Sequence, residues 1–162
     1  MRDESNIGFS LLTSIILAGL LFQAANAIDM RLAMPRLLEL CVCYWVLSSP
    51  ARVGIIFAFA VGILISLIEG SHVGAASIGL SIAAYVLLNN IYTIRQLDWI
   101  SQSVVIFLLL GISVALQRVA LAAVGVSSDG LNYLVAVVIS ALLWRPFNTL
   151  LDSARFRIGQ ML

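Results

Sequence analysis

Few side chains in this sequence have the types and spacing that catalysis needs. The single histidine, His72, follows Ser71 in a polar turn. A serine nucleophile inside a membrane needs its histidine on another helix at the same depth, and two adjacent turn residues do not supply that arrangement. No cluster of Cys, Asp or Glu accompanies His72 at metal-ligand spacing. The sequence therefore predicts no enzyme, no metal site and no cofactor, and His72 is expected to be solvated.

The two other reactive residue types give no catalytic signal either. The sequence contains no lysine, which excludes Schiff-base chemistry and the lysine of a phosphate-binding loop. Cys41 and Cys43 lie two positions apart in an apolar run. On a helix their side chains would point about 200° apart, so they cannot form a disulfide with each other. They are expected to be buried, unreactive thiols.

Three ionisable residues interrupt or border the apolar runs: Glu39, Glu69 and Arg118. A charge in an apolar environment is costly unless it finds a partner or extends along its own side chain to a polar boundary. Two interpretations stay open. Glu39 and Arg118 form an ion pair, or each reaches lipid headgroups separately. The depth of these three residues in the membrane depends on the helices that carry them.

The composition is that of a membrane protein. The chain has 162 residues, of which 62% are apolar and 10% charged, with a mean hydropathy of +1.08. Soluble domains carry roughly 45–50% apolar and about 25% charged residues, so a water-soluble globule is excluded. The formal net charge of +1 provides no concentrated basic face for nucleic acid. No tract is long enough for a separate soluble domain, so residues 1–162 are expected to form a single polytopic membrane domain.

Six apolar segments are separated by charges, prolines and turn residues. They cover residues 7–28, 37–49, 53–68, 73–94, 99–123 and 131–151. A helix needs about 20 apolar residues to cross a bilayer, and backbone groups in lipid must pair internally. The predicted fold class is an all-α integral membrane protein with six transmembrane helices. The two short helices around Pro50 either cross twice or enter and return. The last apolar segment is interrupted near its end by Trp144-Arg145-Pro146-Phe147. The first helix is expected to be retained rather than cleaved as a signal peptide.

The distribution of arginine orients these segments. If the N-terminus lies inside, the outer side carries Arg31 and Arg36, and the inner side carries Arg2, Arg52, Arg95, Arg145, Arg155 and Arg157. Because arginine in short loops accumulates on the cytoplasmic side, both termini are expected to be cytoplasmic. Glu39, Glu69 and Arg118 then lie at the outer level, and no ionisable residue lies near the midplane. This pattern counts against proton pumps and ion carriers.

Small residues recur every four positions along the third segment and into the fourth. They are Ala58, Gly62, Ser66, Gly70 and Gly74. Small side chains at this spacing let helix backbones approach closely in lipid. Two interpretations remain open: the stripe packs the third helix against the fourth, or it receives a partner's transmembrane helix. Uncharged polar residues inside the segments are expected to hydrogen-bond between helices. They are Gln23, Asn89, Asn90, Gln102, Gln117 and Ser140.

Several motifs follow one another in a distinctive order. They are Pro35-Arg36, Tyr44-Trp45, Pro50-x-Arg52-Val53-Gly54, Gly62 through Gly70-Ser71-x-x-Gly74, and Leu143-Trp144 with Pro146. This order resembles that of the rod shape-determining protein MreD family, most clearly over residues 34–85. Two positions depart from the family pattern. Ser66 stands where members often have an aspartate, and Arg145 stands where an apolar or aromatic residue is more usual.

The resemblance implies a non-enzymatic scaffold of the bacterial cell-elongation machinery, located in the inner membrane as a multi-pass protein. It implies binding to MreC, a single-pass protein with a periplasmic domain. It also implies association, direct or indirect, with RodA, its transpeptidase and MreB, so that peptidoglycan synthesis is organised. The family also looks distantly like the substrate-binding membrane subunits of vitamin transporters. A small-molecule-binding or transport subunit is therefore the alternative function. Membrane lipids are expected contacts, and nucleic acid is not.

Overall fold

A computed structural model of the chain describes residues 8, 11–20, 36–69, 74–125 and 132–161. Each described segment is helical or a turn, and no strand occurs among these residues. After an N-terminal helical segment, Leu11–Leu20, come α2 (Leu37–Ser48), α3 (Ile55–Ile68), α4 (Ala75–Asn89), α5 (Ile91–Gln96), α6 (Trp99–Ala123) and α7 (Asn132–Met161). The predicted all-helical class is confirmed.

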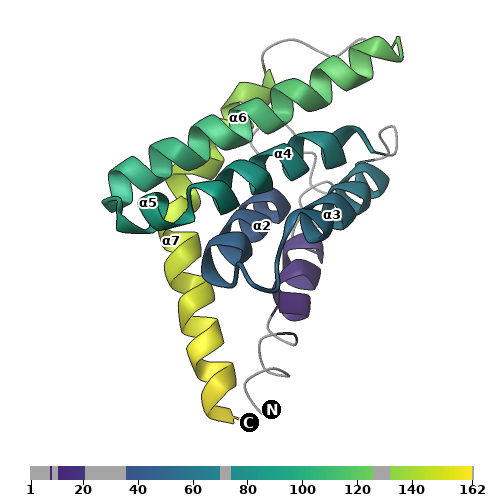
Figure 1. Ribbon diagram of the computed structural model, residues 1–162. Helices are drawn as coiled ribbons and strands as arrows, with labels where there is room; N and C mark the ends of the chain where they lie inside the picture. Colours follow the sequence, from purple (N-terminus) through teal and green to yellow (C-terminus); the bar gives the residue numbers. More distant parts are fainter. Residues whose placement is uncertain (1–7, 9–10, 21–35, 70–73, 126–131, 162) are drawn as a thin grey trace.

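The helices pack around α2 and α4 (Figure 1). α4 lies between α3 and α6, α2 packs against α4, α3 and α7, and α7 packs against α6. Every residue of α2 from Leu38 to Leu47 is buried. A helix that is apolar on all sides belongs in the core of a helical bundle, because it leaves no face that prefers water. The short second segment is therefore a central element of the fold.

Two helices have the length and apolarity needed to cross a membrane. They are Trp99–Ala123 and the part of α7 from Leu134 to Ser153. At a rise of 1.5 Å per residue, the 25 residues of α6 measure about 37 Å, which exceeds the roughly 30 Å hydrocarbon core. α2, α3 and α4 have 12, 14 and 15 residues, so they measure about 18–23 Å. Six full-length spans therefore remain a prediction.

The fourth predicted segment is wrong in one respect, because it forms two helices rather than one. α4 ends at Asn89 and α5 begins at Ile91. Asn90, between them, leaves helical geometry with φ −113° and ψ 20°. Its side-chain amide donates a hydrogen bond of 3.0 Å to the Val86 carbonyl of its own helix. An asparagine amide that bonds to nearby backbone competes with helix continuation, which is the physical reason for the break.

The last segment forms one continuous helix, although residues 144–147 interrupt its apolar pattern. α7 continues through Pro146 as far as Met161, and its C-terminal part extends away from the other helices (Figure 1). Proline removes one backbone hydrogen bond, but its fixed φ is compatible with a helix. Membrane helices tolerate proline because neighbouring polar groups can satisfy the freed carbonyl. The Thr149 hydroxyl also donates a hydrogen bond of 2.9 Å to the Pro146 carbonyl, which supports the turn after the proline.

Candidate functional site

A polar cluster lies where the N-terminal end of α2 meets three other helices. Arg36 stands immediately before α2, and its guanidinium contacts the carboxylate of Glu39, one turn into the helix. The same group lies 4.0 Å from Oε1 of Glu69, which ends α3. Its Nη1 donates a hydrogen bond of 3.2 Å to Oε1 of Gln117 on α6. One guanidinium therefore joins α2, α3 and α6.

Two further hydrogen bonds complete this cluster. Gln117 Nε2 donates to Glu69 Oε2 over 3.0 Å. The backbone N–H of Arg36 donates to Ser140 Oγ on α7 over 2.7 Å, which satisfies a group that the start of a helix otherwise leaves unpaired. We call Arg36, Glu39, Glu69, Gln117 and Ser140 the Arg36 network. It holds together one end of each of α2, α3 and α6, together with the N-terminal half of α7.

The Arg36 network is enclosed by protein. The exposed fraction of the side chain is 4% for Glu39, 14% for Arg36 and 22% for Glu69. Glu39 Oε1 contacts Arg36, whereas Glu39 Oε2 is buried without a hydrogen-bond partner. Burying charged groups is favourable only when their remaining hydrogen-bonding capacity is met. Glu39 is thus the most deeply buried charged member of the network, and it has one oxygen without a hydrogen-bond partner.

The sequence placed Glu39 and Glu69 at the same level of the bundle, and the structure brings them to the same guanidinium. It gives Glu39 a different partner from the expected Arg118. An arginine one turn earlier on the same chain segment is always within reach, so Arg36 forms the pair. Glu39 is also enclosed rather than extended to headgroups. Arg118 lies two turns before the end of α6 and is half-buried.

The expected interhelical role of uncharged polar residues is confirmed for Gln117, Ser140 and Gln102. Sequence reasoning did not join the first two to Arg36, because residues 36, 117 and 140 lie on helices far apart in the chain. The sequence did offer one indication of this contact, the predicted depth of these residues in the membrane. Gln117 lies next to Arg118 at the predicted outer level, where Glu69 also lies.

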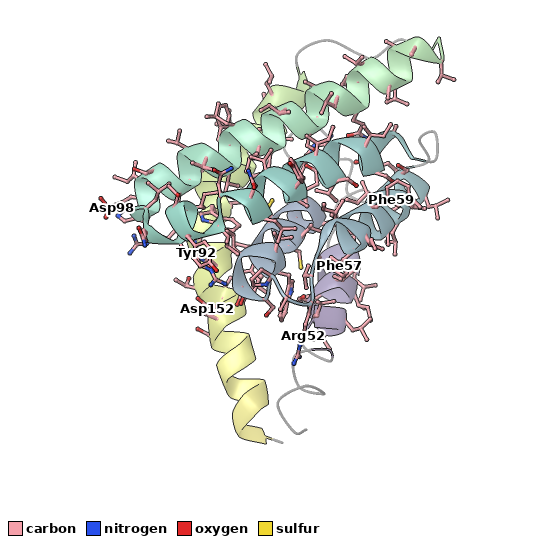
Figure 2. The ribbon with its side chains drawn as sticks, viewed as in Figure 1. Arg52, Phe57, Phe59, Tyr92, Asp98 and Asp152 are labelled. Atoms are coloured by element: carbon pink, nitrogen blue, oxygen red, sulfur yellow. The ribbon has the colours of Figure 1, made fainter. Side chains whose placement is uncertain are left out.

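A second polar layer lies at the opposite end of α2. Tyr44 Oη donates a hydrogen bond of 2.6 Å to Asp152 Oδ1 on α7. Arg95 on α5 donates to the carbonyl of Leu47, where α2 ends. Figure 2 labels Tyr92, Asp98 and Asp152 on this side of the molecule. Arg36 and Tyr44 are eight residues apart, about 12 Å along the helix, so the two layers are separated by about two turns of α2.

Aromatic residues of this layer tie α6 to α7. Trp144 is buried, and its Nε1 donates a hydrogen bond of 3.1 Å to Gln102 Oε1. The Arg145 guanidinium lies 4.6 Å from the centre of the Trp99 ring, a cation–π contact. Arg145 therefore contributes to the contact between the two long helices.

The remaining motif residues that the structure describes lie in helix contacts and in the turn between α2 and α3. Trp45 is buried and donates a hydrogen bond of 2.8 Å from Nε1 to Ser14 Oγ, which anchors the N-terminal helical segment on α2. Pro50 lies in the turn between α2 and α3, and Arg52 in the same turn is exposed. Pro35 lies outside the described residues. Cys41 and Cys43 are buried and free, as predicted.

The small-residue stripe faces α4. Ala58, Gly62 and Ser66 are buried, and a Cβ on Gly62 would lie 2.4 Å from Ser77 Cα. The Ser66 hydroxyl donates to the Gly62 carbonyl over 3.1 Å. It also accepts the N–H of Ala76 on α4 over 3.4 Å. This geometry supports the packing interpretation of the stripe, because α4 occupies the face that a partner helix would need.

The C-terminal end of the stripe lies just before α4. Gly74 precedes α4 with a φ of +97°, a backbone conformation that glycine adopts readily and that other residues adopt at a cost. Gly70 lies outside the described residues. Among the described residues, no group of three or more His, Cys, Asp or Glu side chains could hold a metal ion.

The described helices form an apolar helical bundle that a buried ion pair and interhelical hydrogen bonds cross-link, and two of them are long and apolar enough to cross a membrane. A family model described as rod shape-determining protein MreD matches residues 3–154 of the chain. The chain therefore belongs to the MreD family of rod shape-determining membrane proteins.

A curated relative agrees with this assignment. The rod shape-determining protein MreD of Haemophilus influenzae is 31% identical over 100 residues. The aligned region covers 62% of this chain and 62% of the relative, so the chain matches less than two thirds of the relative's length. No solved structure matches the chain.

Proposed function

We propose that this protein is a non-enzymatic scaffold of the bacterial cell-elongation machinery in the inner membrane. In this role it binds MreC and, with RodA, its transpeptidase and MreB, helps to organise peptidoglycan synthesis. The observation that carries the proposal is the family match over residues 3–154, because the family is described by rod shape determination. The single polytopic domain and the cytoplasmic termini expected from the arginine distribution belong to the same proposal.

The internal packing supports a scaffold that holds its shape. Gly62 brings α3 into backbone contact with α4, and a Cβ on Gly79 would lie 2.3 Å from the Ser113 carbonyl oxygen on α6. Close backbone approach is the main source of helix association in lipid, where the hydrophobic effect gives no drive. α4 is thereby fixed between α3 and α6, and the bundle presents its outer helix faces in a constant arrangement.

The surface offers apolar faces of the kind that lipid or a partner helix contacts. On α6, Val104, Leu108 and Ile112 are each about half exposed and recur every four residues. On α3, Ile56 and Phe59 are exposed on the side away from the stripe. Because the small-residue stripe is buried against α4, a partner's transmembrane helix would bind to outer faces of this kind. No observation specifically favours the small-molecule-binding alternative.

The proposal is tested by purifying the tagged protein from native membranes in mild detergent and identifying the chains that co-purify. MreC is expected in near-stoichiometric amount, and it should be absent from a preparation of an unrelated multi-pass protein with the same tag. A correctly folded preparation that contains no MreC would contradict the proposal. A small molecule retained at one equivalent, without any protein partner, would favour the transport-subunit alternative.

A further inference from the structure

The Arg36 network contains acceptor capacity that the described side chains do not use. It places one guanidinium between two carboxylates, those of Glu39 and Glu69. Glu39 Oε2 is buried and receives no hydrogen bond. A buried carboxylate oxygen without a donor is unfavourable, so a native structure normally supplies one. The two carboxylates therefore have more acceptor capacity than Arg36 and Gln117 fill.

Glu69 is the most exposed member of the network. Glu69 ends α3, and its side chain is 22% exposed, whereas the Glu39 side chain is 4% exposed. Gln117 holds the Glu69 carboxylate through Oε2, and Glu69 Oε1 lies 4.0 Å from Arg36. A group that approaches along Glu69 thus meets a positioned carboxylate, and Glu39 is the more enclosed carboxylate of the two.

The chemistry of the network favours an organic cation over a metal ion. The described residues contain no group of three or more His, Cys, Asp or Glu side chains that could hold a metal. The guanidinium of Arg36 lies between the two carboxylates and would repel a dication. A guanidinium or ammonium group with several N–H donors instead suits carboxylates that already accept from arginine and glutamine.

We infer that the Glu69 edge of the Arg36 network is a docking point for a basic side chain, Arg or Lys, of the partner protein. This inference rests on the proposed function, because it names the chemistry by which a scaffold of this kind recognises its partner. The cation comes from the part of the partner that leaves the membrane at the end of the bundle where α3 ends. Ion pairs at the edge of an interface fix register and partner choice.

The experiment measures capture of MreC by the purified, tagged protein in nanodiscs. Glu69→Gln removes the charge while keeping the shape, and we expect about a fivefold loss of capture, the size of a partly exposed ion pair. Glu69→Asp keeps the charge and should retain more capture than Glu69→Gln. Asp98→Asn is the matched control, since Asp98 is an exposed acid at the opposite end of the bundle, and it should bind as the wild type does. Unchanged melting temperatures show that the variants fold.

Charge reversal gives the decisive comparison. Glu69→Arg should lose capture, and a Lys→Glu or Arg→Glu change in the MreC segment next to the membrane should restore it. Wild-type binding by Glu69→Gln and Glu69→Arg would overturn the inference and leave the proposed function intact. If the wild type captures no MreC, both fail. An effect of Glu69→Gln that requires phosphatidylethanolamine and disappears in phosphatidylcholine alone would assign the cation to a lipid and overturn the inference.

Discussion

At the scale of the residue, the polar side chains of this protein act through few but specific contacts. Arg36 alone contacts or approaches Glu39, Glu69 and Gln117, each on a different helix. Removing one partner of a buried charge is far more costly than the net stabilisation of the pair, because the other charge stays buried. Substitution of Arg36 should therefore lower the stability of the protein more than substitution of any one apolar neighbour.

Glycine has an equally specific role where helices touch. Gly62→Ala places a Cβ 2.4 Å from Ser77 Cα, and backbone cannot move aside as a flexible side chain does. We expect the free energy of unfolding to fall by about 1–3 kcal/mol, the usual cost of overpacking. Unfolding of the purified protein in a mixed-micelle denaturant titration measures the change.

Gly111→Ala is the matched control for this substitution. Gly111 is also inside a helix, α6, and a Cβ there would meet no atom within 4 Å. Alanine favours the helix over glycine by up to about 1 kcal/mol, so this variant should be as stable as the wild type or more stable. Equal stability of both alanine variants would show that α3 and α4 are not in backbone contact at Gly62.

At the scale of the element, helix ends are set by contacts with other helices as well as by local sequence. α2 ends at Ser48, and no basic residue stands in its own last turn. Arg95, on α5, donates to the Leu47 and Ser48 carbonyls instead. The last carbonyls of a helix need such donors, and a positive charge is favoured there. The short helix α5 therefore acts as the C-terminal cap of the buried helix α2.

The contact of Arg95 with the end of α2 predicts a loss of stability when the guanidinium is removed. Arg95→Met keeps the apolar stem and removes the guanidinium. We expect the free energy of unfolding to fall by about 1 kcal/mol, less than the roughly 1.5–3 kcal/mol of a charged hydrogen bond, because Arg95 is exposed. Gln96→Met, the next residue on α5 and also exposed, should leave stability unchanged. Thermal unfolding of both purified variants tests the difference. Equal melting temperatures would mean that the contact contributes nothing.

At the scale of the whole molecule, polar groups gather in two layers at opposite ends of α2. Arg36 belongs to the first layer, and Tyr44 with Arg95 belongs to the second. The helices alternate in direction, so that the end of α3 and the last turns of α6 meet in the first layer. The membrane crossings expected from the apolar segments, and the side of the membrane on which each layer lies, remain predictions.

The two ends of α6 provide the test of that prediction. Asp98→Cys and Val124→Cys place exposed thiols at the N-terminal and C-terminal ends of this helix. In intact spheroplasts a membrane-impermeant maleimide should label Val124→Cys only, and Asp98→Cys should require permeabilisation. The native Cys41 and Cys43 are buried and should give no background. Labelling of both variants from the same side would show that α6 does not cross the membrane.

Composition and helix-length apolar runs were enough to predict the helical class of the protein, because both depend only on the local chain. The sequence predicted α6 to the residue, the free buried cysteines, and the level shared by Glu39 and Glu69. The order of its motifs also indicated the MreD family. These features follow from transfer free energies and helix geometry, which act on each segment separately.

Which polar groups pair, and which helix packs against the small-residue stripe, became visible only in the folded bundle. Arg36 rather than Arg118 neutralises Glu39, and α4 rather than a partner packs against Gly62. The break at Asn90 and the continuity through Pro146 also depended on context. The physical reason is that several pairings at one depth satisfy the same charges, and only the packing of the helices brings one set of atoms within hydrogen-bonding distance.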